Sequence, residues 1–154
     1  MKIRIVAVGN KMPAWVEEGC REYSKRLPKE FAVNTIEIPL APRGKSTSTK
    51  IAKEKEGEKL LAAAADSYVI ALDAGGKSWS TEQLARHVDQ WRMLGRDVSM
   101  LIGGPDGLSR QCLAEADRQW SLSALTLPHP LVRVVLMEQL YRAWTLLNNH
   151  PYHK

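Results

Sequence analysis

Three loops, each following a strand-like segment, carry the residue types best suited to holding a ligand. They are Leu72-Asp73-Ala74-Gly75-Gly76, Ile102-Gly103-Gly104-Pro105-Asp106-Gly107 and Leu122-Ser123-Ala124-Leu125-Thr126-Leu127-Pro128. Glycines let a backbone approach a bulky ligand and expose its hydrogen-bonding groups, and the apolar third loop would suit an adenine ring. Because ligands of open α/β sheets bind beyond the carboxyl ends of strands, the second and third loops predict a binding site. Gly75-Gly76 alone is better interpreted as a tight turn.

Residues 71–78 also fit a relaxed phosphate-loop pattern, with alanine for the first glycine and Gly76-Lys77-Ser78 at the end. The context argues against that role. The loop proper is too short to wrap phosphates, and the capping signals place the next helix start at Ser80. No later strand ends in an aspartate that would hold magnesium. A phosphate-loop nucleotidase therefore stays only as an alternative.

Other chemistries have weaker support in the sequence. His150 and His153 have a metal-like spacing, but Pro151 interrupts it and no further Cys/His pair accompanies them, so no metal is expected. The chain lacks the Gly-x-Ser-x-Gly elbow of serine hydrolases. It also lacks the Gly-x-Gly-x-x-Gly fingerprint of dinucleotide-binding domains.

Strand and helix patterns alternate along the chain and place these loops. Extended segments are expected at residues 3–8, 31–38, 68–72, 98–102 and 120–127. Helices are expected at residues 13–27, 48–65, 80–94, 109–117 and 131–148, with Thr47 or Ser48, Ser80 and Ser109 as N-caps. Five such βα units predict an α/β fold with a mostly parallel sheet flanked by helices, in a single domain covering residues 1–154.

Composition supports a globular protein that contacts a polyanion. The 154 residues are 44% hydrophobic and 25% charged, which argues against disorder or a coiled coil. Two cysteines without a C-x-x-C motif suit the reducing cytoplasm, and no apolar run is long enough for a membrane span. The net charge is +5, with basic ends around a slightly acidic centre at residues 61–128. This distribution suggests that a polyanion contacts the ends, although ordinary surface lysines would give the same pattern.

The last expected helix is apolar on nearly every side, from Leu131 through Trp144 to Leu147. Such a helix must be buried on more than one side. We therefore expect a homodimer through this C-terminal helix. The alternative is a helix fully internal to a monomer.

Several segments, among them Leu101-Ile102-Gly103-Gly104-Pro105 and the ending Tyr152-His153-Lys154, together resemble one family, the small bacterial ribosomal RNA large-subunit methyltransferases H of the SPOUT class. The likeness covers the whole chain, and the Gly-Gly-Pro loop combined with a Tyr-His ending is highly specific. The matching segments are Val6-Ala7-Val8-Gly9, Lys55-Glu56-Gly57, Leu72-Asp73, Leu101-Ile102-Gly103-Gly104-Pro105, residues 122–129, Arg133-Val134, residues 138–143 and Tyr152-His153-Lys154.

The resemblance implies a SPOUT fold with a C-terminal trefoil knot, a homodimer, and S-adenosylmethionine as the cofactor. It implies methylation of N3 of a pseudouridine in 23S rRNA of the assembled ribosome. The cofactor would contact Leu72, Gly103 and the third loop, namely Leu122, Ser123, Ala124, Leu125, Thr126 and Leu127. The Gly75-Gly76 pair departs from the family pattern, and we expect it to leave cofactor binding unaffected.

Methylation of N3 requires the loss of its proton, so a base near neutral pKa or a stabilising cation would help. His153 and Tyr152 on the tail are the candidate bases, and Arg142 and Arg133 are candidate cations. We expect a composite site in which the tail of one subunit closes over the cofactor of the other. A frayed terminus is the alternative for the tail.

RNA phosphates would meet the basic first half of the chain, although the sequence cannot rank its members. The basic residues of the first half that could contact RNA phosphates are Lys2, Arg4, Lys11, Arg21, Lys25, Arg26, Arg43 and Lys45. The five tryptophans are expected in the core.

Besides the methyltransferase and the phosphate-loop nucleotidase, a third possible function is a non-catalytic ribosome-binding dimer that has lost its cofactor.

Overall fold

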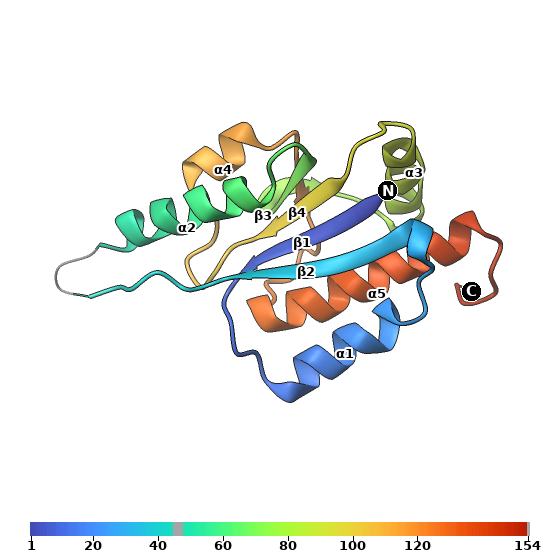
Figure 1. The fold of residues 1–154 in the computed structure, drawn as a ribbon, viewed down its shortest axis with the longest axis horizontal. Coiled ribbons are helices and arrows are strands. Elements are labelled where there is room, and N and C mark those ends of the chain that lie inside the picture. The colour runs from blue at the N-terminus through green and yellow to red at the C-terminus, as the bar shows by residue number, and fades with distance from the viewer. Residues whose placement is uncertain (45–47, 154) are drawn as a thin grey trace.

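The computed structural model describes residues 1–44 and 48–153, and in them strands and helices alternate along the chain (Figure 1). A short 3₁₀ turn, Lys29–Phe31, precedes the second strand. The elements are β1 (Lys2–Val8), α1 (Ala14–Ser24), β2 (Ala32–Ile38), α2 (Thr49–Ala63), β3 (Tyr68–Ser78), α3 (Thr81–Arg92), β4 (Val98–Ile102), α4 (Arg110–Glu115), β5 (Arg118–Ser121) and α5 (His129–Leu147).

The five strands form one sheet in the order β2-β1-β4-β3-β5, with every neighbouring pair parallel. The central strand β4 is buried along its whole length, as expected for a parallel strand covered on both faces. The predicted α/β class and parallel sheet are therefore confirmed.

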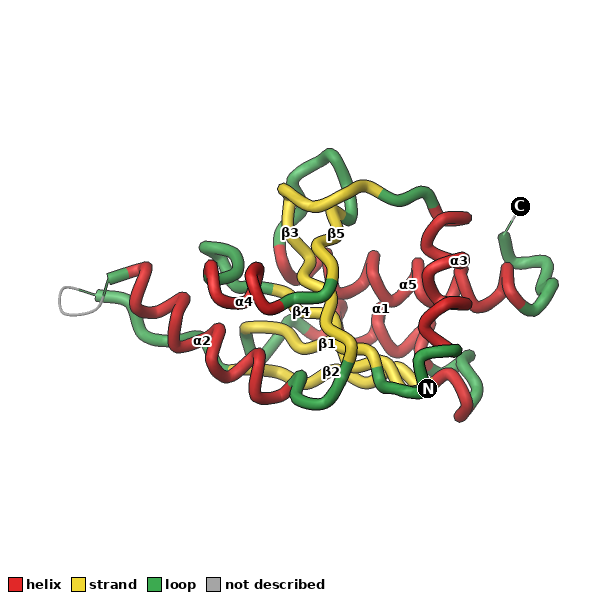
Figure 2. Tube along the Cα trace, turned by 90° about the horizontal axis from the view of Figure 1, so that it is seen from above, coloured by secondary structure: helices red, strands yellow, loops and turns green. Residues whose placement is uncertain are grey.

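Helices cover both faces of the sheet and form two separate cores (Figures 1 and 2). Ile3 and Ile5 of β1 face a core built with α3 and α5, and α1 packs against α5. Val6 and Val8 face the other side, where α2 and α4 cover the sheet. This alternation along one strand follows from the two-residue period of its side chains.

Most helix starts agree with their sequence signals. Ser48 caps α2, Ser109 caps α4, and Ser80 forms a complete capping box with Gln83 at α3. Thr47, the other candidate cap, lies outside the described residues. Helix α5 begins two residues earlier than expected because Pro130 fits in its first turn, where no backbone donor is needed.

Two predictions at the edge of the sheet are wrong. Strand β3 does not end at Leu72 but continues to Ser78, with a register shift against β5 between Leu72 and Lys77. A Cβ on Gly76 would lie 2.6 Å from backbone atoms of Gln119 and Trp120, so the glycine permits this close pairing. Strand β5 ends at Ser121, and the expected extended segment beyond it is a loop.

Helix α5 lies against the sheet between α1 and α3, which explains much of its apolar composition. Leu136, Met137 and Leu140 are fully buried. Residues on its remaining side, such as Leu131 and Val135, are only partly covered. No helix in the described part of the chain is long and apolar enough to cross a membrane.

Candidate functional site

A large cleft lies at the carboxyl ends of β4 and β5 and beside the middle of β3, where the three segments expected to be loops meet. It has a volume of ≈ 890 Å³. All eight residues predicted to contact a cofactor line it: Leu72, Gly103, Leu122, Ser123, Ala124, Leu125, Thr126 and Leu127. Parallel strands bring their carboxyl ends to one edge of the sheet, which is why segments distant in sequence converge here.

The turn after β4 forms one wall of the cleft. The Gly107 amide donates to the Gly104 carbonyl at 3.0 Å, which closes the turn. A Cβ on Gly103 would lie 2.5 Å from the Gly107 backbone, and Gly107 adopts a positive φ of 80°. This fold of the chain therefore has room only for glycine at position 103 and favours it at position 107.

The loop after β5 forms the opposite wall. The Leu125 amide donates to the Ser123 hydroxyl at 2.9 Å, and the Ser121 hydroxyl donates to the Ser123 carbonyl. The Leu125 side chain is 75% exposed at the cleft. An apolar side chain this exposed beside a cleft is suited to contact a bound ligand.

The electrostatics of the cleft suit a cation with an apolar body. Asp73 is the single charged side chain among the described residues that line it. The His129 Nδ1 atom at its edge is buried and has no hydrogen-bond partner within the described residues. Burial, and then the positive charge of Arg133, lower the pKa of His129, so its imidazole is neutral at pH 7.

This lining fits S-adenosylmethionine better than a nucleoside triphosphate. The leucines of the cleft can enclose an adenine ring, and the Asp73 carboxylate favours a sulfonium charge. No lysine or arginine among the described lining residues is available to neutralise phosphates. The phosphate-loop alternative also fails locally, because residues 76–78 belong to β3 and α3 starts only at Thr81.

The tail residues gather at the other end of α5. The Arg142 Nε donates to the Glu138 carboxylate at 2.8 Å, and its Nη1 lies 3.3 Å from the His153 Nδ1. The Tyr152 hydroxyl donates to Glu138 at 3.2 Å, and its ring lies 4.8 Å from the Arg142 guanidinium. The His153 Nε2 lies 3.3 Å from the Glu82 carboxylate. The predicted catalytic residues Arg142, Tyr152 and His153 are thus brought together, which argues against a frayed tail.

Sequence reasoning did not single out Glu138 or Glu82, which organise this cluster. The only signal for Glu138 was its i,i+4 spacing to Arg142 on one helix face. Burial, followed by the nearby negative charge of Glu138, raises the pKa of Tyr152. Tyr152 is therefore a hydrogen-bond donor rather than a base at neutral pH.

The cleft and the tail cluster do not form one site within a single chain. His129 borders the cleft at the start of α5, and Arg142 follows 13 residues later on the same helix. At 1.5 Å of rise per residue, the two lie about 20 Å apart.

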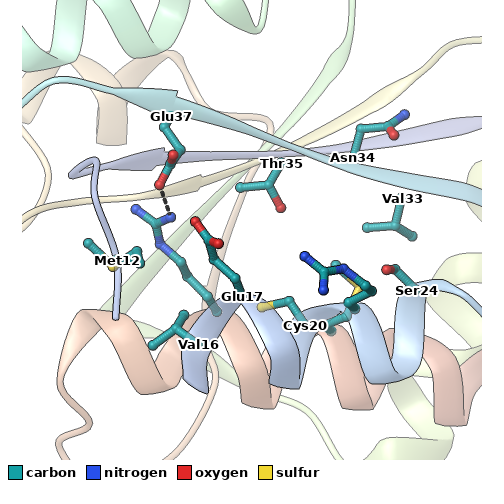
Figure 3. Close-up of a pocket in the computed structure, with 12 residues that line it drawn as sticks. Met12, Val16, Glu17, Cys20, Ser24, Val33, Asn34, Thr35 and Glu37 are labelled. Carbon is teal, nitrogen blue, oxygen red and sulfur yellow. Dashed lines mark hydrogen bonds and ion pairs between the residues drawn. The ribbon is translucent and has the colours of Figure 1, made fainter. Parts of the chain in front are cut away.

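Arg133 is not available as a cation for RNA, so that prediction is wrong. Its side chain is 4% exposed and pairs with Glu37 at 2.6 Å, the contact marked by a dashed line in Figure 3. Its Nη2 also donates to the Gly9 carbonyl at 2.7 Å. Arg133 also lines a second cavity of ≈ 310 Å³ between α1 and β2. Cys20 and Thr35 project into this cavity (Figure 3).

Two further expectations about the surface change. Arg43 is held by Glu56 and Asp106 rather than free for phosphates, and Lys45 lies outside the described residues. Trp91 and Trp120 are buried as expected, but Trp15 is 53% exposed on α1, so its placement in the core is wrong.

Comparisons with known proteins agree with this geometry. Residues 1–153 match a family model described as "Predicted SPOUT methyltransferase". Proteins named Ribosomal RNA large subunit methyltransferase H are 60% identical in Marinomonas sp. and 60% identical in Saccharophagus degradans, each over 100% of both chains. The relative of that name in Hahella chejuensis is 55% identical over 100% of this chain and 99% of its own.

Solved structures with low sequence identity share the fold. A probable methylase family protein from Haemophilus influenzae Rd KW20 superposes with a TM-score of 0.62 at 15% identity, covering 99% of this chain and 70% of that one. TrmJ from Z. mobilis ZM4 gives a TM-score of 0.55 at 16% identity, covering 92% and 70%. Given the family model that spans nearly the whole sequence, this chain belongs to the SPOUT methyltransferase family.

Proposed function

We propose that this methyltransferase uses S-adenosylmethionine to methylate N3 of a pseudouridine in 23S rRNA of the assembled ribosome. The observation that carries the proposal is the cleft at the sheet edge, lined by all eight expected cofactor contacts and lacking basic side chains among its described residues. The names of the 55–60% identical relatives support large-subunit rRNA as the substrate.

The cofactor would be held between the Gly103–Gly107 turn and the loop after β5. Leu72, Leu122 and Leu127 would enclose its adenine, and exposed backbone groups of the glycine turn would bond its polar parts. S-adenosylmethionine supplies a methyl group already activated by the sulfonium charge. The task of the chain is therefore to orient the acceptor nitrogen and to remove its proton.

The tail cluster has the groups for that task. Arg142 would stabilise negative charge that develops on the ring oxygens as N3 loses its proton, and the protonated Tyr152 would donate to the same oxygens. Because Tyr152 keeps its proton, His153 is the stronger candidate for the base, and the contacts of its two ring nitrogens with Arg142 and Glu82 orient the ring.

The 20 Å between cleft and tail supports a homodimer in which each tail completes the partner's cleft. The partly covered apolar side of α5 is the proposed dimer face. The proposal includes a trefoil knot in the C-terminal third, one domain over residues 1–154, and a cytoplasmic location. Recognition of the RNA would use the shape of the assembled ribosome.

Methyl transfer to ribosomes carrying or lacking the pseudouridine tests the proposal. We expect labelled methyl groups to enter only the ribosomes with the pseudouridine. Binding of the protein to both without methyl transfer would favour the non-catalytic ribosome-binding dimer. Calorimetry should show binding of S-adenosylmethionine and no binding of ATP, and the reverse result would favour a nucleotidase.

A further inference from the structure

A buried carboxylate on the core face of α2 requires an explanation. Glu56 is 2% exposed, and it shares that face with Ala52, Gly57 and Leu60. A carboxylate removed from water is strongly unfavourable unless it is paired and fully hydrogen-bonded. An apolar residue would fill this buried position at a lower cost, so the carboxylate of Glu56 must have a role beyond packing.

Arg43, from the segment after β2, supplies the pairing. Its Nη1 and Nη2 donate to the two Glu56 oxygens at 2.7 Å and 3.2 Å. The Ala41 amide donates to the same carboxylate at 3.0 Å, and Arg43 donates back to the Ala41 carbonyl at 2.8 Å. A bidentate contact of this kind fixes the orientation of the guanidinium as well as its position.

The Nε of Arg43 reaches the turn that forms one wall of the cleft. It donates to Asp106 at 2.8 Å. Asp106 belongs to the turn 103–107, of which the other four residues, Gly103, Gly104, Pro105 and Gly107, all line the cleft. Asp106 is the one residue of this turn that does not line the cleft, and Arg43 binds it on the side away from the cleft.

The same segment also supports the turn by packing. A Cβ on Gly104 would lie 3.0 Å from the Val8 side chain and 3.4 Å from that of Leu40, so the turn rests on both residues. The turn is closed by the hydrogen bond from the Gly107 amide to the Gly104 carbonyl and by an isolated antiparallel bridge between these two glycines. Contacts from outside add to this closure, and Arg43 provides the only ion pair to the turn within the described residues.

We infer that Arg43 is a positioning residue for the cofactor: anchored on buried Glu56, it fixes the 103–107 turn through Asp106 in the shape that binds S-adenosylmethionine. The inference rests on the proposed function. It assigns a role to the Lys55-Glu56-Gly57 segment, which lies outside the cleft.

Two conservative variants test the link. Arg43→Lys keeps a positive charge beside Glu56 but cannot hold two carboxylates in the fork geometry of arginine. Asp106→Asn keeps the Arg43–Glu56 pair and weakens only the contact to the turn. We expect each to raise the calorimetric Kd for S-adenosylmethionine about tenfold, the size expected for one charged hydrogen bond. The unfolding midpoint should change little in Asp106→Asn and fall in Arg43→Lys, because buried Glu56 then loses its bidentate partner.

The double variant separates positioning from general damage. If Arg43 acts through Asp106, the double variant has the Kd of either single variant, because both remove the same link. Hydrogen exchange of the Gly107 amide, measured without ligand, should be faster in all three. The matched control is Arg92→Lys with Asp89→Asn, an exposed pair on α3 at the amino-terminal edge of the sheet, which should bind as wild type.

A wild-type Kd in Arg43→Lys or Asp106→Asn would overturn the inference. So would effects that multiply in the double variant, or unchanged exchange at Gly107. Failure of the wild-type protein to bind S-adenosylmethionine would instead contradict the proposed function, while Gly107 exchange would still report whether Arg43 controls the turn.

Discussion

At the scale of single residues, Glu138 and Glu82 decide how the tail is held. Glu138 accepts hydrogen bonds from both Arg142 and Tyr152, and Glu82 lies against His153. Three side chains from the last third of the chain are thereby fixed relative to one another before any RNA is bound. Such preorganisation lowers the cost of orienting catalytic groups.

Replacing His153 with alanine should remove the proposed base while leaving the cleft intact. We expect kcat to fall by about 100-fold or more, the usual size of a general-base effect. Binding of S-adenosylmethionine, measured by calorimetry, should not change. His150→Ala is the matched control, because His150 lies exposed in the same tail, where its ring lies near Tyr141 and Trp144 and its Nδ1 accepts from the Tyr152 amide. Full methylation by the His153 variant would remove this residue from the mechanism.

His129 should make stability depend on pH. Burial, and then the charge of Arg133, lower its pKa from the usual 6.5, so the unfolded chain takes up the proton first as the pH falls. Folding stability therefore decreases as the pH falls through about 6.5. His87, whose pKa is lowered mainly by burial, acts in the same direction.

Urea unfolding at about pH 7.5 and about pH 5.5 measures this effect. The loss of stability between the two values should be smaller in His129→Gln than in the wild type. It should be smaller again when His87→Gln is added. An unchanged loss in the double variant would contradict the assignment.

At the scale of elements, the β3–β5 pairing is where local sequence signals were misleading. Gly75-Gly76 has the composition of a turn, but a long-range contact with Gln119 and Trp120 extends the strand through it. Helix starts were predictable because a serine cap acts on amides two or three residues away. Strand ends were not, because the partner strand decides them.

Gly76→Ala tests this pairing, since the added Cβ would overlap the β5 backbone. We expect a loss of about 2 kcal/mol in the free energy of unfolding, typical of overpacking against backbone. Gly75→Ala is the matched control, because among the described residues its Cβ would come near only a carboxylate oxygen of Asp73, at 3.0 Å. Equal losses in the two variants would show that strand propensity, and not the close approach, is responsible.

At the scale of the whole molecule, the sequence predicted which residues line the cleft and which belong to the tail. It did not predict how these two groups lie relative to each other. Parallel topology explains why the cleft residues converge at one edge of the sheet. The separation of the tail from that edge follows from the length of α5, which the apolar run also predicted. The burial of Arg133 and Glu56 depends on contacts with distant segments, Glu37 and Arg43, that no local pattern reveals.

Mixed dimers give the most direct test of the proposed composite site. Thr126→Arg would place a bulky positive side chain in a cleft suited to a cation, and Thr126 is exposed, so folding should be unaffected. This variant and His153→Ala should each be inactive alone. A dimer with one copy of each has one intact cleft facing one intact tail only if the tail acts on the partner. Co-expression should then restore about a quarter of wild-type methyl transfer, since about half of the dimers are mixed and each has one working site. If cleft and tail instead act within one chain, no mixed dimer has a working site and co-expression restores nothing.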